Sequence, residues 1–157
     1  MSKPAHSAPL IKSKERVAQH GEVMTPEHIV NDMLDLVKQE TERIESRFLE
    51  PACGTGNFLI EILRRKLDVV DARYRKSQYE WERAAVTAVS ALYGIELLPD
   101  NVDECRSRLF AFFEGRYAER FKKKIKPDCL ESARYVLRKN IIWGDALTLK
   151  TADGKDQ

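Results

Sequence analysis

Residues 48–59 read FLEPACGTGNFL, a short apolar segment that runs into a turn with two glycines. Beyond the turn, Leu59, Ile62, Leu63, Leu67 and Val70 recur at helical spacing on one face. The order is therefore strand, glycine loop, helix. Gly54 and Gly56 would let a ligand approach the backbone closely, and the N-terminus of the following helix offers unpaired N–H groups.

Strands and helices alternate outward from this loop. Short apolar runs predict strands over 47–50, 91–96 and 140–143. Apolar spacing predicts helices within 77–91, from Pro99 onward and near 129–138. This alternation is typical of a parallel sheet with crossover helices, so an α/β fold is expected.

A helix is also expected before the first strand. Thr25 is a good N-cap and Pro26 fits the first helical position. Val30, Met33, Leu34 and Val37 follow at the spacing of an amphipathic helix and are expected to form its buried stripe.

Acidic residues or glycines follow each expected strand, at 50–56, Glu96 and Asp145. Because ligands bind outside the carboxyl ends of the strands in open α/β sheets, these features should converge on one site. Taken singly, Glu96 and Asp145 are better interpreted as ordinary loop acids, and Thr25-Pro26 is interpreted equally well as a helix cap alone. Their joint occurrence at successive strand ends favours a site.

A dinucleotide-binding fold is the first alternative, because it shares the strand, glycine loop and helix. The pattern departs from it. Phe58 and Leu59 stand near the position of the third glycine of GxGxxG. The acidic residue of a second strand should follow after about 20 residues, whereas Glu96 comes much later.

The 48–59 segment closely resembles the cofactor-binding motif of DNA adenine-N6 methyltransferases, as found in restriction-modification methylases. GEVMTP at 21–26 resembles the N-terminal cofactor motif of that family, with Met24 where Phe is usual. YGIE at 93–96 and NIIWGDAL at 140–147 resemble its next two motifs in the expected order. The resemblance implies a Rossmann-like S-adenosylmethionine-dependent methyltransferase fold, incomplete, with the first three parallel strands and their flanking helices.

The resemblance also implies a set of residues that bind S-adenosylmethionine: Thr25, Pro26, Glu50, Pro51, Ala52, Cys53, Gly54, Gly56, Asn57, Phe58, Ile95, Glu96, Asp145 and Ala146. Glu50 would face the ammonium group of the ligand, and Glu96 would accept from both ribose hydroxyls. Asp145 would accept from the adenine amino group. Thr25 and Pro26 would lie by the methionine part, Ile95 or Ala146 would pack on the adenine ring, and Cys53 would be a lining residue rather than a nucleophile.

The family performs methyl transfer with an Asn/Asp-Pro-Pro-aromatic segment after its fourth strand, which helps to hold a flipped adenine. The prolines of this chain, at 4, 9, 26, 51, 99 and 127, form no Pro-Pro pair. No catalytic residue is therefore predicted. The strand beginning at Phe48 would have an open edge, so we expect pairing with another polypeptide or with a second copy.

Composition and charge bear on whether the chain is a nucleic-acid-binding or a membrane protein. Basic and acidic residues number 27 and 25, which gives no global case for nucleic-acid binding. Within 116–126 the charge is locally basic, and a solvated helix end is favoured over a phosphate contact. The absence of a long apolar run or secretory signal predicts a cytoplasmic protein without a membrane segment.

The metal-binding residue types are too scattered to predict a metal. Cys53, Cys105 and Cys129 form no CxxC pair and are expected to be reduced, packed thiols. His6, His20 and His28 lack the spacing of a metal site.

Three regions are expected: a flexible arm over 1–16, the partial methyltransferase domain over 17–150 and a polar tail over 151–157. The leading hypothesis is the S-adenosylmethionine-binding part of a DNA adenine-N6 methyltransferase of a restriction-modification system. It would act on DNA and need further sequence or a partner for catalysis. The alternatives are a non-catalytic cofactor-binding or interaction module of a restriction-modification complex, and a remnant that binds nothing.

Overall fold

A parallel three-stranded arrangement forms the centre of the structure, a computed structural model that describes residues 11–20 and 22–153. The strands are β1 (Phe48–Glu50), β2 (Leu92–Glu96) and β3 (Ile141–Asp145), with a short β4 (Lys150–Thr151). Among the described residues the strand order is β1-β2-β3-β4. β1 and β2 pair in parallel, as do β2 and β3, whereas β4 runs antiparallel to β3. The expected α/β class is confirmed, in the form of a small mixed sheet.

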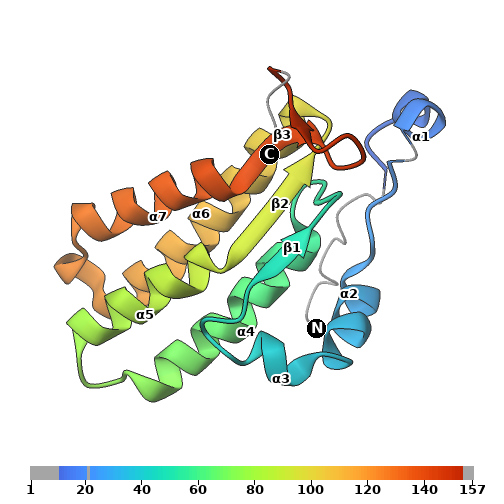
Figure 1. The fold of residues 1–157 in the computed structure, drawn as a ribbon. Coiled ribbons are helices and arrows are strands. Elements are labelled where there is room, and N and C mark those ends of the chain that lie inside the picture. The colour runs from blue at the N-terminus through green and yellow to red at the C-terminus, as the bar shows by residue number, and fades with distance from the viewer. Residues whose placement is uncertain (1–10, 21, 154–157) are drawn as a thin grey trace, which may run out of the picture.

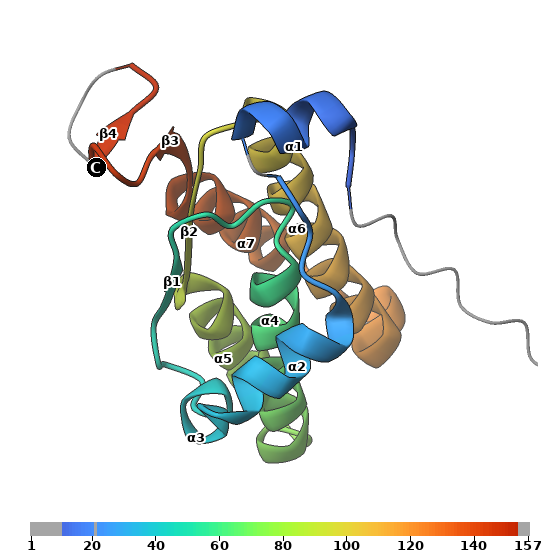
Figure 2. The ribbon, with the colours of Figure 1, turned by 90° about the vertical axis from the view of Figure 1, so that its right-hand side faces the viewer.

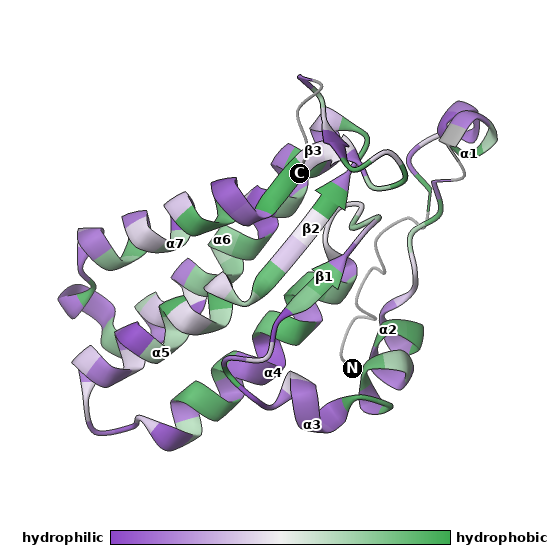
Figure 3. Ribbon diagram, in the orientation of Figure 1, coloured by the Kyte–Doolittle hydropathy of each residue, from purple (hydrophilic) through white to green (hydrophobic). Residues whose placement is uncertain are grey.

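The helices are α1 (Lys14–His20), α2 (Glu27–Asp35), α3 (Lys38–Thr41), α4 (Asn57–Arg73), α5 (Gln78–Ser90), α6 (Pro99–Phe121), the 3-10 turn η1 (Lys122–Lys124) and α7 (Pro127–Asn140). Figures 1 and 2 show the long helices α4 to α7 gathered on one side of the parallel strands. Hydrophobic residues recur along these strands (Figure 3). Leu49, on the edge strand β1, is 62% exposed.

The main core lies between the helices and the sheet. Trp81 of α5 and Tyr117 of α6 are fully buried and stack with ring centroids 5.2 Å apart. Phe113, one turn before Tyr117, is also fully buried. The large aromatic area removed from water here holds α5, which precedes β2, against α6, which follows it.

Several helix predictions are confirmed with adjusted bounds. α5 falls within the predicted 77–91, and α6 begins at Pro99 as predicted. α7 is longer than the predicted 129–138, because Pro127 occupies its first turn and the helix continues to Asn140, directly before β3.

The predicted start of α2 is wrong. Pro26 is the N-cap residue, and no side chain caps the helix. The carbonyl oxygen of Thr25 instead accepts a hydrogen bond from Asn57 Nδ2 at 3.1 Å, which draws Thr25 toward the glycine loop. Of the predicted stripe, Val30 and Leu34 are buried, while Met33 and Val37 are 51% and 44% exposed.

The ends of the described chain are more ordered than expected. Lys14 to Arg16, part of the predicted flexible arm, begin α1, while residues 1–10 lie outside the described residues. At the other end, Thr151 pairs with Gly144, and the Ala152 N–H donates to the Trp143 carbonyl at 3.0 Å. The predicted polar tail therefore starts as a strand.

The basic segment 116–126 is not simply a solvated helix end. Arg116 forms ion pairs with Asp68 and Asp71 of α4 at 2.8 and 2.6 Å. Arg120 pairs with Asp71, and Lys126 with Glu82. These cations therefore join α6 and the start of α7 to neighbouring helices.

Two further predictions concern cysteines and membranes. The three cysteines are free and buried, which confirms the expected packed thiols. Within the described residues, no helix is both long and apolar enough to cross a membrane.

Candidate functional site

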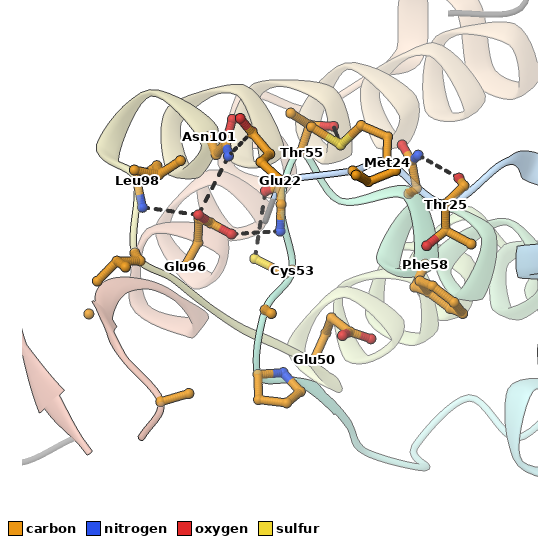
Figure 4. A pocket seen from close by; sticks show the side chains of 18 of the residues that line it. Glu22, Met24, Thr25, Glu50, Cys53, Thr55, Phe58, Glu96, Leu98 and Asn101 are labelled. Carbon is orange, nitrogen blue, oxygen red and sulfur yellow. Dashed lines mark hydrogen bonds between the residues drawn. The ribbon is translucent and has the colours of Figure 1, made fainter. Parts of the chain in front are cut away.

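A cavity of about 570 Å³ opens at the carboxyl ends of the three parallel strands (Figure 4). Its walls come from four parts of the chain: the segment before α2, the glycine loop after β1, the loop and first turn after β2, and the turn after β3. The lining residues are Glu22, Val23, Met24, Thr25, Glu50, Pro51, Ala52, Cys53, Gly54, Thr55, Asn57, Phe58, Glu96, Leu97, Leu98, Asn101, Gly144, Asp145, Ala146 and Leu147.

Most of the residues predicted for the site are brought together here, as expected from the convergence of strand ends. The exceptions are Pro26, Gly56 and Ile95, which do not line the cavity. Glu22 to Met24, Thr55 and Gly144 were missed although they belong to the segments used in the prediction. Leu97, Leu98 and Leu147 follow predicted residues directly, so counting whole loops would have included them. Asn101, in the first turn of α6, gave no sequence signal.

Glu96 ties the loops of the cavity together. Its Oε2 accepts from the Gly54 N–H at 2.8 Å, and its Oε1 accepts from the Leu98 N–H at 3.0 Å. The residue is only 8% exposed. Because a buried carboxylate is costly unless hydrogen-bonded, these two backbone donors explain how Glu96 is held at the end of β2.

Gly54 and Gly56 are required in the loop for different structural reasons. Gly54 has φ +52°, and a Cβ there would lie 3.7 Å from Met24 Sδ, in ordinary contact. Gly56 has φ +90°, and a Cβ there would lie 2.7 Å from Cys105 Sγ. Gly54 therefore supplies a left-handed turn beside the cavity, whereas Gly56 also permits the close approach of the loop to α6.

Arg108 of α6 is hydrogen-bonded to the glycine loop. Its Nη1 donates to the Thr55 carbonyl at 2.7 Å and to Thr55 Oγ1 at 2.8 Å. The same nitrogen donates to Asn57 Oδ1 at 3.0 Å. Since Asn57 in turn donates to Thr25, Arg108 fixes both the loop and the segment before α2.

A family model described as N-6 DNA Methylase matches residues 11–105. This chain belongs to the N-6 DNA methylase family. The match includes three of the four segments that line the cavity and ends before the turn that follows β3. No curated protein and no solved structure matches the chain.

Glu50, at the end of β1, is another carboxylate that lines the cavity. Burial raises the pKa of Glu50, and a hydrogen bond from the Ala52 backbone opposes this increase. A cation placed beside Glu50 would stabilise its ionised form.

Asp145 lies at the end of β3. Its Oδ1 accepts from the Leu147 N–H at 2.8 Å, which closes the turn from Gly144 to Leu147. The side chain thus shapes the wall of the cavity that the turn after β3 provides.

Cys53 is buried, with 6% of its surface exposed. A hydrogen bond with Cys105 and burial together raise the pKa of Cys53 well above its ordinary value. Because the thiolate is the reactive form, Cys53 is suited to lining the cavity and not to nucleophilic attack. In the described part of the chain, no group of three or more His, Cys, Asp or Glu side chains is placed to hold a metal ion.

Proposed function

We propose that this N-6 DNA methylase family member binds S-adenosylmethionine in the cavity at the strand ends. It would be the cofactor-binding part of a DNA methyltransferase that methylates adenine N6 in a restriction-modification system. The observation that carries the proposal is the pairing of Glu96 with the glycine loop. A buried carboxylate is hydrogen-bonded to the half-buried Gly54, and both residues line a cavity of about 570 Å³. That volume lies within the range of about 300–1,000 Å³ usual for small-ligand sites.

Glu50 supports a ligand with a positive group at the β1 end. Burial raises the pKa of Glu50, which means that its surroundings penalise the ionised form of this carboxyl. The ammonium of the ligand would offset that penalty by Coulombic attraction and charge-assisted hydrogen bonding.

Glu96 has limited capacity for a ribose. A carboxylate has about four acceptor positions. Oε1 takes the Leu98 N–H and a longer contact of 3.5 Å from Asn101, while Oε2 takes the Gly54 N–H. We therefore assign ribose binding to the remaining acceptor position of Oε2, in place of two equivalent contacts to the two hydroxyls.

Asp145, with Ala146, would complete the site at the adenine end, and Thr25 would lie at the methionine end. Pro26, Gly56 and Ile95 retain only supporting positions, since they lie outside the lining. We also propose that the sheet is the first part of a Rossmann-like methyltransferase fold.

We assign no catalytic residue to this chain. When bound, S-adenosylmethionine supplies the methyl group. Binding of the flipped adenine, and the acceptors that draw on its amino group as it attacks, would come from further sequence or from a partner chain. The contribution of this chain would be to hold and orient the cofactor.

The test is calorimetric titration of S-adenosylmethionine into the unmodified chain and into Glu96→Ala. We expect binding that Glu96→Ala weakens about tenfold or more, in line with the loss of a hydrogen bond to a charged group. Glu114→Ala, an exposed acid on α6 outside the cavity, is the control and should bind as the unmodified chain does. Absence of binding by the unmodified chain would refute the proposal.

A second candidate function is an interaction module that binds the cofactor without catalysis. The edge of β1 favours it, because β1 pairs only with β2 among the described residues. Adding the complementary part of a restriction-modification methylase separates the two functions. Complex formation with methyl transfer supports the first, and complex formation without transfer supports the second.

A further inference from the structure

The segment before α2 is fastened to the start of α6 by a charged network. We call residues 11–20 and 22–26 the N-terminal strap. Lys12 Nζ donates to Glu104 Oε2 at 2.6 Å and to Asn101 Oδ1 at 2.7 Å. Arg16 Nη1 donates to Asp100 Oδ2 at 2.6 Å, and the hydrogen bond from Arg16 lowers the pKa of Asp100 to about 2. Asp100 is therefore ionised at neutral pH.

Asn101 connects this network to the cavity. The residue is 1% exposed, and its Nδ2 donates to Glu22 Oε1 at 2.6 Å and to Glu96 Oε1 at 3.5 Å. Figure 4 shows the carboxamide between the two carboxylates. The orientation of the amide is fixed by its neighbours, because a lysine ammonium only donates and an ionised carboxylate only accepts.

Two negative groups thus face one neutral donor in a buried place. The side chain of Glu22 is 8% exposed, and Glu96 is 8% exposed. Glu22 is balanced by Arg16, with which it forms an ion pair. Without the amide between them, the two carboxylates would repel each other and Glu96 would lose a restraint on Oε1.

We propose that Asn101 is a positioning residue of the cofactor site, which couples attachment of the N-terminal strap to the orientation of Glu96. The inference rests on the proposed function, because its effect is measured through ligand binding. Asn101 acts on the ligand through Glu96. The attached strap therefore strengthens binding of the ribose, in addition to supplying cavity wall at Glu22 to Thr25.

A merely structural role for Asn101 makes a different prediction. If Asn101 only stabilised the first turn of α6, removing its side chain would weaken the binding of every ligand of the cavity to a similar degree. If Asn101 positions Glu96, binding weakens mainly for ligands that carry ribose hydroxyls. A pair of ligands that differ only in those hydroxyls separates the two roles.

The experiment is calorimetric titration of S-adenosylhomocysteine and of its 2′,3′-dideoxy analogue into the whole chain. Asn101→Ala should weaken binding of S-adenosylhomocysteine about tenfold and binding of the dideoxy analogue less than about twofold. Lys12→Met removes a partly exposed cation from the strap. It should weaken binding of S-adenosylhomocysteine about threefold and affect the dideoxy analogue less. Lys14→Met, an exposed neighbour in α1, is the matched control and should change neither.

Melting curves accompany the titrations. If Asn101→Ala does not fold, Lys12→Met alone decides. The inference is overturned if a folded variant weakens both ligands in parallel, if neither variant changes either, or if the unmodified chain binds both ligands equally. An unmodified chain that binds neither S-adenosylmethionine nor S-adenosylhomocysteine overturns the proposed function, and this inference with it.

Discussion

Gly56 shows how one residue without a side chain brings two elements together. Its φ is +90°, and an added Cβ would lie 2.7 Å from Cys105 Sγ in α6. Gly56→Ala should lower the free energy of unfolding by about 2–4 kcal/mol, from overpacking and the left-handed backbone. Chemical denaturation measures this.

Gly115→Ala is the matched control for this substitution. Gly115 lies inside α6, and a Cβ there meets nothing within 4 Å. It should stabilise the chain by about 0.5–1 kcal/mol, as alanine does in a helix interior. Equal stability of the two alanine variants would contradict the close contact between Gly56 and α6.

We expect ionised Glu50 to lower the stability of the fold and to strengthen ligand binding. Burial raises its folded-state pKa, so between the ordinary pKa of glutamate, about 4.3, and that raised value the native state binds more protons than the unfolded state. Ionised Glu50 therefore costs stability as pH rises through this window.

Glu50→Gln should raise the melting temperature at pH 7, with no gain below about pH 4.3. The same substitution should weaken S-adenosylmethionine binding, because the ligand ammonium loses its anionic partner. If the variant melts at a lower temperature at pH 7 and its affinity for the ligand is unchanged, then burial does not penalise the ionised Glu50 carboxylate as proposed.

At the scale of elements, Lys66 of α4 anchors the approach to β1. The side chain is fully buried, and its Nζ donates to the carbonyls of Arg43, Ile44 and Ser46. Burial lowers the pKa of Lys66 to about 8, so the ammonium with its three donors is the main form at pH 7. The chain entering β1 is therefore held by one cation.

Lys66→Met should lower the free energy of unfolding by about 2–4 kcal/mol, because it leaves three buried or partly buried carbonyls without this donor. Denaturant unfolding at pH 7 measures the loss. Lys76→Met, an exposed lysine between α4 and α5, should be neutral. Similar stability of the two variants would contradict the anchoring role.

Elements with a local signal were predictable from the sequence. The strand at Phe48, the glycine loop and α4 follow one another within 48–73, and hydrophobic spacing and turn residues are local. The convergence of these segments on one cavity was predictable from the topology, since strand ends of a parallel sheet converge whatever the side chains between them.

The remaining elements depend on contacts distant in sequence. α1 and the strap are ordered by the pairs of Lys12 and Arg16 with residues 100–104, which no local pattern reports. β4 has two residues and exists through its pairing with β3. Asn101 was missed because an asparagine in the first turn of a helix is unremarkable until its partners are known.

For the whole molecule, the unpaired side of β1 is the feature with the widest consequence. Within the described chain β1 has a strand on one side, and Leu49 is 62% exposed. An open apolar edge favours pairing with a second chain. We expect the purified chain to associate at micromolar concentration in sedimentation velocity.

Leu49→Lys should shift the chain toward the monomer without unfolding it, because a charge on an edge strand opposes pairing. Tyr79→Lys, at an equally exposed position on α5, should leave association unchanged. A compact monomer at all concentrations would contradict pairing through this edge.

The central claim is that the cavity at the strand ends is a site for S-adenosylmethionine and not for a dinucleotide. Thermal melting of the unmodified chain with an excess of each ligand tests it most directly. The account predicts that S-adenosylmethionine raises the melting temperature and that NAD does not. Unchanged melting with S-adenosylmethionine, or stabilisation by NAD alone, would contradict it.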